Sequence, residues 1–236
     1  MMKYLLFVKN VKTLLNFEGD VMSKILVLDT ETGGLNPDKH SILSYGAVIL
    51  DDFKIIDQIE VYVNEGNIIA EESALRVNKI DLKYLVEHGY SPLPAVELLE
   101  NFLLKHFNFL DCTKYNLINM SGHNIGFDVG FMKRLYRLAG REYEKVFSHR
   151  TLDTAGIIRF LNVAGVSDLS SSSSDKAFDY FRIVIPEEKR HTALGDAIGT
   201  AELLVELVYL VKNKGDSLSP RQMNNVMTGI KTEKQP

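Results

Sequence analysis

The chain has 236 residues, of which 45% are hydrophobic and 25% are charged, with a net charge of −4 and a pI of about 5.9. These values are typical of a soluble globular protein with one domain of ordinary to large size, and they argue against a protein that coats long nucleic acids by bulk positive charge. The single cysteine, Cys112, excludes an internal disulfide and fits a reducing compartment.

Residues 1–23 precede the first strong strand and are predicted to be an N-terminal extension, with Met22 as an alternative start. The apolar stretch between Lys3 and Lys9 is shorter than the roughly 7–15 residues of a signal-peptide core. No run approaches the roughly 20 apolar residues of a membrane span. We therefore expect a cytoplasmic protein that does not bind membranes.

From residue 24 the pattern predicts strands first and helices later. The expected strands are Ile25–Asp29, 42–50, 54–63 and Asn116–Ser121. Asp51-Asp52 is a turn signal that joins the second and third strands into a hairpin. The expected helices are 73–78, 82–88, 93–107, a segment after the loop 122–128 that ends at Ala139 before Gly140, 153–161, a short one near 177–181, and 192–212.

Two segments read as irregular. Ser170–Ser174 is compositionally a flexible loop, and the polar residues 213–236 are expected to be a loosely held tail. The order of elements indicates an α/β domain over residues 24–212, built around a mixed sheet.

Asp29 and Glu31 stand at the end of the first buried strand. Side chains alternate between the faces of a strand, so these two carboxylates point the same way. Like charges this close repel each other, and burying an unpaired carboxylate is costly. The pair therefore predicts half of a divalent metal site.

Three further residues complete the predicted site. Asp128 starts a helix after a strand, His191 precedes the last helix, and Asp196 lies in its first turns. Oxygen ligands of this kind suit Mg²⁺ or Mn²⁺, whereas zinc sites favour histidine and cysteine.

In these segments the chain resembles the DEDD exonucleases of the histidine subclass, which include the epsilon-type proofreading subunit of bacterial replicative polymerase, ribonuclease T and oligoribonuclease. Three family motifs occur in order: Asp-x-Glu followed by Thr and Gly at Asp29–Leu35, His-Asn-x-x-Phe-Asp at His123–Asp128, and His-x-x-x-x-Asp at His191–Asp196. The resemblance covers roughly residues 24–212. It implies a ribonuclease H-like fold and metal-dependent removal of nucleotides from 3′ ends.

The resemblance also implies a role for each motif residue. The four acids Asp29, Glu31, Asp128 and Asp196 would hold two ions, Mg²⁺ or Mn²⁺, and His191 would be the general base that activates the attacking water. Two such ions stabilise both the attacking and the leaving oxygen, and a histidine accepts a proton near neutral pH. The residues expected to contact or shape the substrate pocket are Thr32, Gly33, Gly34, Leu35, Asn124 and Phe127.

Other polar residues have plainer readings. His123 is expected to pack behind the site, and Asp153 to cap a helix. The basic stripe, which we define as Lys133, Arg134, Arg137 and Arg141, is expected to be a solvated helix face. Lys189 and Arg190 are alternatives for contact with the nucleic-acid backbone.

The leading functional prediction is a 3′→5′ exonuclease that acts on single-stranded DNA or RNA ends, most similar to the epsilon-type group and so favouring proofreading or repair. The alternatives are an oligoribonuclease-like enzyme and a non-catalytic scaffold bound to a polymerase. Association with a polymerase stays open, although the polar tail favours a free-standing nuclease.

Overall fold

The structure, a computed structural model, describes residues 24–110 and 117–212. The predicted extension 1–23, the predicted tail 213–236 and Cys112 lie outside the described residues. No helix in the described part of the chain combines the length and the apolar character that crossing a membrane requires.

Five strands form one mixed sheet in the order β3-β2-β1-β4-β5. They are β1 (Lys24–Thr32), β2 (Ile42–Asp51), β3 (Lys54–Tyr62), β4 (Ile118–Gly122) and β5 (Phe147–Asp153). The first three are antiparallel neighbours, whereas β4 runs parallel to both β1 and β5. The α/β class with a mixed sheet is confirmed.

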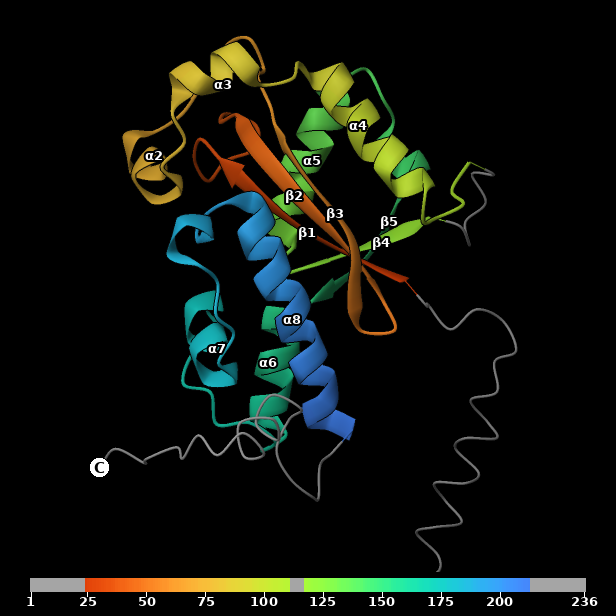
Figure 1. The fold of residues 1–236 in the computed structure, drawn as a ribbon, viewed down its shortest axis with the longest axis vertical. Coiled ribbons are helices and arrows are strands. Elements are labelled where there is room, and N and C mark those ends of the chain that lie inside the picture. Colours follow the sequence, from red (N-terminus) through yellow and green to blue (C-terminus); the bar gives the residue numbers. More distant parts are fainter. Residues whose placement is uncertain (1–23, 111–116, 213–236) are drawn as a thin grey trace, which may run out of the picture.

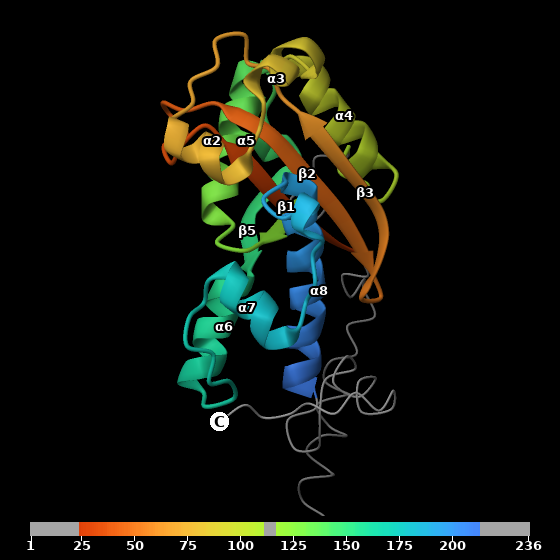
Figure 2. The same ribbon diagram turned by 60° about the vertical axis from the view of Figure 1, so that its left-hand side comes forward.

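The helices cover both faces of this sheet (Figure 1). They are α2 (Glu72–Asn78), α3 (Leu82–His88), α4 (Pro92–Leu104), α5 (Gly126–Leu138), α6 (Thr154–Val163), α7 (Ser174–Phe181) and α8 (Ala193–Lys212), with 3₁₀ turns at Tyr143–Lys145 and Glu187–Lys189. Helices α4 and α5 cover one face and α8 covers the other. Figure 2 shows α6 and α7 beside α8, away from the sheet.

Alternation along β1 divides its side chains between the two cores. Leu26 and Leu28 pack into the larger core with α4 and α5, whereas Val27 packs with Ala197 and Ala201 of α8. Because positions 29 and 31 share the parity of position 27, their side chains face α8. The alternation of side chains along β1 therefore places the acidic pair on the face of the sheet that α8 covers.

The hairpin between β2 and β3 is confirmed, and its turn is tight. Asp51 pairs with Lys54, and the two residues between them, Asp52 and Phe53, have φ values of 47° and 61°. Two positive φ values in a two-residue turn match the twist of the flanking strands.

Several boundaries differ from the prediction. The strand predicted over Asn116–Ser121 spans Ile118–Gly122 in the described residues, which do not include Asn116, and the helix predicted over 93–107 ends at Leu104. Strand β5 was not predicted, because an edge strand that is largely exposed over its middle residues carries little apolar pattern. The five-serine segment ends in the first turn of α7, since Ser174 is already helical.

The basic stripe is not a uniform solvated face, so that prediction was wrong for Arg134. This residue donates two hydrogen bonds to the carboxylate of Glu65, at 3.0 and 2.8 Å, and a third to the carbonyl of Pro37. The side chains of Arg134 and Glu65 are only 13% and 2% exposed. The pair fastens α5 to the segment after β3 and to the loop that follows the first motif.

We expect Arg134→Ala to lower the free energy of unfolding by about 3–5 kcal/mol, because it leaves the Glu65 carboxylate buried without its cation. Urea unfolding followed by circular dichroism measures this loss. Lys133→Ala is the matched control, since its ion pair with Glu144 is largely exposed and is worth at most about 1 kcal/mol. Equal losses for the two variants would contradict a structural role for the buried pair.

Candidate metal centre and active site

Three of the predicted acids meet at the end of β1. Asp29 and Glu31 face α8, and Asp196 lies in the first turn of that helix. One carboxylate oxygen from each of the three residues lies within 4.8 Å of the others. This spacing allows a single cation to contact all three oxygens.

Helix α8 can approach β1 this closely because β2 has a glycine opposite Asp29. Gly46 is the register partner of Asp29. A Cβ atom at this position would lie 2.4 Å from backbone atoms of Ala193 and Leu194, at the start of α8. Only a residue without a side chain therefore lets the start of α8 rest against the sheet beside the acidic pair. Gly46 was not predicted, because the backbone atoms that it approaches belong to α8, far away in the sequence.

The start of α8 also positions His191. Thr192 caps the helix, because its hydroxyl accepts a hydrogen bond from the Gly195 amide at 3.0 Å. His191 precedes it with a φ of 61°, in the left-handed region. Its Nδ1 lies 3.9 Å from Oδ2 of Asp196, and its side chain is 37% exposed. The predicted base is thus beside the acids with part of its ring open to solvent.

Asp128 reaches the same end of β1 from α5. Its Oδ1 accepts hydrogen bonds from the amide and the hydroxyl of Thr30, at 2.9 and 2.7 Å, and the residue is only 4% exposed. The group of oxygens within 4.8 Å does not include Asp128, but its charge acts on Asp29. The structure therefore places all four predicted acids at one site, three of them in a tight group.

The pKa values of Asp29, Glu31 and Asp128 are all raised, with burial as the largest cause. Burial is the largest cause of the raised pKa of Asp29, followed by the charges of Asp128, Asp196 and Glu31. Burial, then Asp196 and Asp128, raise the pKa of Glu31 to about 8. Burial also raises the pKa of Asp128 to about 7, although the hydrogen bonds from Thr30 oppose the shift.

Arg190 supplies positive charge to the group. Its Nη1 donates to Oδ1 of Asp196, and its charge lowers the pKa values of Asp29 and Glu31. The sequence offered Arg190 as a contact to the nucleic-acid backbone. In this structure two carboxylates hold it, those of Asp196 and Asp175.

The acids fit a divalent metal ion. Asp29, Glu31 and Asp196 offer only oxygen atoms. Burial, and then repulsion by the neighbouring carboxylates, raise the pKa values of Asp29 and Glu31, and a single arginine offsets this only in part. A divalent cation would remove this repulsion. Hard oxygen ligands favour Mg²⁺ or Mn²⁺ over zinc.

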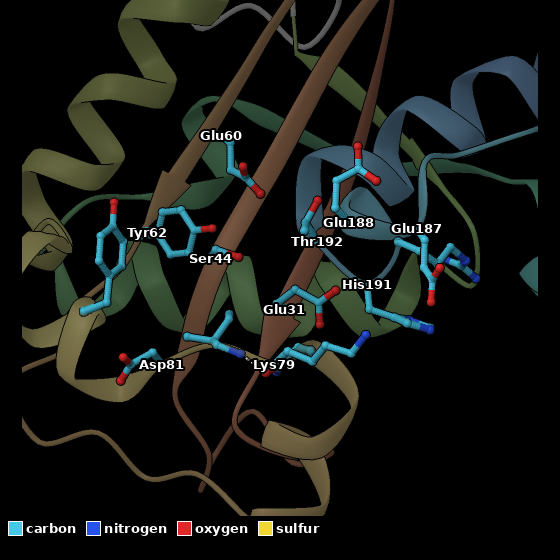
Figure 3. Close-up of a pocket in the computed structure, with 14 residues that line it drawn as sticks. Glu31, Ser44, Glu60, Tyr62, Lys79, Asp81, Glu187, Glu188, His191 and Thr192 are labelled. Atoms are coloured by element: carbon cyan, nitrogen blue, oxygen red, sulfur yellow. Dashed lines mark hydrogen bonds between the residues drawn. The ribbon is translucent and has the colours of Figure 1, made fainter.

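A pocket of about 230 Å³ leads away from this group. In Figure 3, Glu31, Thr192 and His191 lie together at one part of it, while Tyr62 and Asp81 lie across it. Three further acidic residues, Glu60, Glu187 and Glu188, line the walls of the pocket, and Lys79 adds a positive charge.

The later residues of the first motif mostly contact the chain itself. The hydroxyl of Thr32 donates to the carbonyl of Gly34. A Cβ at Gly33 would lie 2.3 Å from the carbonyl oxygen of Ile69, and one at Gly34 would lie 2.4 Å from the ring of His40. These glycines are therefore required for packing of the loop, which leaves Leu35, 82% exposed, at its tip. Contact of any of these residues with substrate stays a prediction.

The second motif is held by its neighbours. Asn124 has a φ of 60°, and its amide donates to Oδ1 of Asp153, which also caps α6 as predicted. Phe127 packs beside Phe131, with ring centroids 5.0 Å apart. His123 contacts the Thr154 hydroxyl at 2.9 Å and the Ser172 carbonyl at 2.8 Å, so its expected packing role is confirmed.

Residues 26–204 match the model of the RNase_T family, which is described as an exonuclease family. The chain belongs to this exonuclease family. The three motifs place it with the DEDD type of these proteins, and membership of the family implies dependence on a divalent metal.

Similar proteins include polymerases and nucleases. A PolC-type DNA polymerase III from Caldanaerobacter subterraneus is 27% identical over 210 residues, or 89% of this chain and 13% of the polymerase. An epsilon-like protein from Rhodobacter capsulatus is 36% identical over 93 residues, 39% of this chain and 12% of that protein. Ribonuclease T from Buchnera aphidicola is 28% identical over 197 residues, 80% of this chain and 84% of the relative. The chain thus spans only 12–13% of the two polymerase-related proteins.

Among solved structures, Escherichia coli exonuclease I in complex with a dT13 oligonucleotide has a TM-score of 0.66 with this exonuclease. The sequences are 14% identical, and the superposition covers 88% of this chain and 44% of exonuclease I. At this identity the likeness establishes the fold, a ribonuclease H-like sheet with helices on both faces.

We expect Gly46→Ala to weaken Mn²⁺ binding by about 10–100-fold, the range typical of residues that support a metal site. The added methyl group pushes the start of α8, and Asp196 with it, away from Asp29. Isothermal titration calorimetry measures the affinity. Gly156→Ala is the control, because its nearest neighbour atom would be 3.7 Å away. An unchanged affinity in Gly46→Ala would contradict the positioning role.

The raised pKa of Glu31 also predicts how stability depends on pH. Between about pH 4.5 and pH 8 the folded protein keeps a proton on Glu31 that the unfolded chain releases, so metal-free stability falls as pH rises through this window. We expect Glu31→Gln to flatten this fall, and Mg²⁺ to raise the wild-type melting temperature more at pH 8.5 than at pH 5.5. Differential scanning fluorimetry across this range is the measurement.

Glu72→Gln is the control, since Glu72 is exposed on α2. If Glu31→Gln and Glu72→Gln have pH profiles parallel to that of the wild type, Glu31 does not carry the effect.

Proposed function

We propose that this chain is a metal-dependent 3′→5′ exonuclease of the histidine subclass. It would hydrolyse the phosphodiester bond at the 3′ end of a nucleic acid and release nucleoside monophosphates. The observation that carries the proposal is the group of three carboxylates within 4.8 Å, with His191 beside it, in a member of the exonuclease family.

Asp29, Glu31, Asp128 and Asp196 would hold two ions, Mg²⁺ or Mn²⁺. When bound, such ions stabilise the charge on the attacking and leaving oxygens of an in-line displacement. Asp128 has one oxygen engaged by Thr30, which fixes its carboxylate plane and leaves the second oxygen for a ligand. The Thr30 backbone therefore couples the first motif to the second.

His191 would act as the general base that takes a proton from the attacking water. Its side chain lines the pocket and is partly exposed, so a bound 3′ end can lie within its reach. The neighbouring Asp196 carboxylate would stabilise the imidazolium that forms when the ring accepts a proton. General base catalysis of this kind typically contributes about 10²–10⁴-fold to the rate.

The substrate would be a single-stranded or frayed end. The exposed Leu35 at the loop tip would contact the terminal base, and the pocket continues from Glu31 to Tyr62 and Tyr84, whose rings offer stacking surfaces to further bases. Similarity to the polymerase-related proteins favours DNA proofreading or repair, with association with a polymerase as an open possibility.

RNA ends are the second candidate substrate. The match to ribonuclease T covers 84% of that protein's length, whereas the matches to the polymerase-related proteins cover a small part of each. An oligoribonuclease-like preference for very short RNA belongs to the same alternative.

The test is an assay with 3′- and 5′-labelled single-stranded DNA and RNA, in Mg²⁺, in Mn²⁺ and in chelator. We expect mononucleotides to be released from 3′ ends only when metal is present. Asp29→Asn should abolish turnover, because it removes a metal ligand. His191→Ala should lower turnover by about 10²–10⁴-fold while metal binding is retained.

Three results would contradict a part of the proposal or favour an alternative function. Wild-type turnover in His191→Ala would remove the general-base role. Activity confined to dinucleotides would favour the oligoribonuclease-like alternative. Inactivity of the metal-loaded wild type on every substrate would favour a non-catalytic scaffold.

A further inference from the structure

Arg190 lies between two carboxylates that come from different helices. Its Nη1 donates to Oδ1 of Asp196 on α8, and its Nη2 donates to Oδ1 of Asp175 on α7. Asp196 belongs to the metal centre, whereas Asp175 lies outside the group of oxygens that could share one ion. The arginine therefore joins the centre to a residue with no place in the three motifs.

The guanidinium is held in this position by more than charge. Its Cζ lies 5.1 Å from the centroid of the Phe178 ring, Nη2 is 3.4 Å from the Ser174 hydroxyl, and the side chain is only 18% exposed. The hydrogen bond from Arg190 is also the main cause of the lowered pKa of Asp175.

The second motif fixes the segment from which α7 starts. His123 contacts the carbonyl of Ser172 at 2.8 Å, and Arg159 donates to the hydroxyl of the same serine at 3.1 Å. Asp175 follows three residues later, in the first turn of α7. The predicted flexible serine loop is thus anchored next to Arg190, and Asp175 has a fixed place relative to the metal centre.

A divalent ion and Arg190 compete for Asp196. Both are cations, both need its carboxylate, and the repulsion between them is strong when they share one partly buried ligand. Asp175 offers the arginine a second anion away from the three oxygens.

We propose that Arg190 is the counter-ion of the metal-free centre, and that metal binding displaces it from Asp196 while Asp175 retains it. Only the metal-binding part of the proposed function is needed for this exchange. Arg190 thus sets metal affinity through its contact with Asp196, and Asp175 is the partner that makes its release from Asp196 favourable.

The alternative is that Arg190 orients Asp196 for the metal. The two roles predict opposite changes in metal affinity when Arg190 is removed. A competitor weakens metal binding, so its removal tightens it, whereas the removal of an orienting residue loosens it. A substitution of Asp175 distinguishes the two roles further. Without Asp175, Asp196 is the remaining carboxylate partner of Arg190, so a competing arginine would block the metal more strongly.

The experiment is isothermal titration calorimetry of the whole chain with Mn²⁺ alone, together with thermal melting in chelator. We expect Arg190→Gln to tighten Mn²⁺ binding roughly tenfold and to lower the metal-free melting temperature. Asp175→Asn should weaken Mn²⁺ binding by a similar factor. If Arg190→Gln does not fold, Arg190→Lys retains the charge but cannot bridge both carboxylates, and it should tighten binding by a smaller factor.

Lys176→Gln and Asp179→Asn, both on α7, are the controls. Lys176→Gln removes the same charge as Arg190→Gln, and Asp179→Asn removes the same charge as Asp175→Asn. They should shift the affinity much less than Arg190→Gln and Asp175→Asn. Weaker binding in both Arg190 variants, or binding in Asp175→Asn equal to that of the wild type, would overturn the exchange. The nuclease assay tests the proposed function separately. If the wild type binds Mn²⁺ but is inactive, and the Arg190 and Asp175 variants still shift Mn²⁺ affinity in opposite directions, only the proposed function is refuted.

Discussion

Repulsion among carboxylates at the end of β1 is the constraint on which this site depends. The pleat of the strand directs Asp29 and Glu31 to the same face, and α8 adds Asp196 within 4.8 Å of both. Such a group destabilises the folded state unless a cation is present. Packing of the fold therefore holds these carboxylates together against their mutual repulsion. A cation bound between them would remove that repulsion.

The packing that opposes this repulsion also supports the core. Ala197 and Ala201 of α8 lie against Val27 of β1, so the helix that carries Asp196 is held by small apolar side chains directly behind it. Gly46 lets the same helix approach the sheet at its N-terminal end. Because the same helix belongs to the core and carries Asp196, the packing of the core fixes where this acid lies relative to β1.

The sequence predicted the parts of this arrangement that depend on local patterns. The parity of positions 29 and 31, the hairpin at Asp51-Asp52 and the cap at Asp153 follow from strand alternation, turn chemistry and capping, and all are present in the structure. Other parts required contacts between distant segments. Gly46 was missed because its neighbours are in α8, and β5 because its largely exposed middle gives little apolar pattern.

The same limit explains why the partners of two arginines were not predicted. Arg134 follows the second motif as part of a basic stripe, yet its partner, Glu65, is 69 residues away. Arg190 adjoins the third motif, and its second partner lies on α7, next to a serine run that composition alone marks as a flexible loop. Sequence patterns reveal which residues carry charge, but the partner that neutralises each charge is set by tertiary structure.

These contacts make the three motifs act together. Thr30, within the first motif, holds Asp128 of the second, and His123 of the second anchors the serine segment that leads to Asp175. Asp175 in turn binds Arg190, which contacts Asp196 of the third. Energetic effects of changes along such a connected chain are not independent, so substitutions in different motifs should be strongly non-additive. The three motifs therefore form one electrostatic unit, in which the pKa values of Asp29 and Glu31 in the first motif are raised by Asp128 of the second and Asp196 of the third.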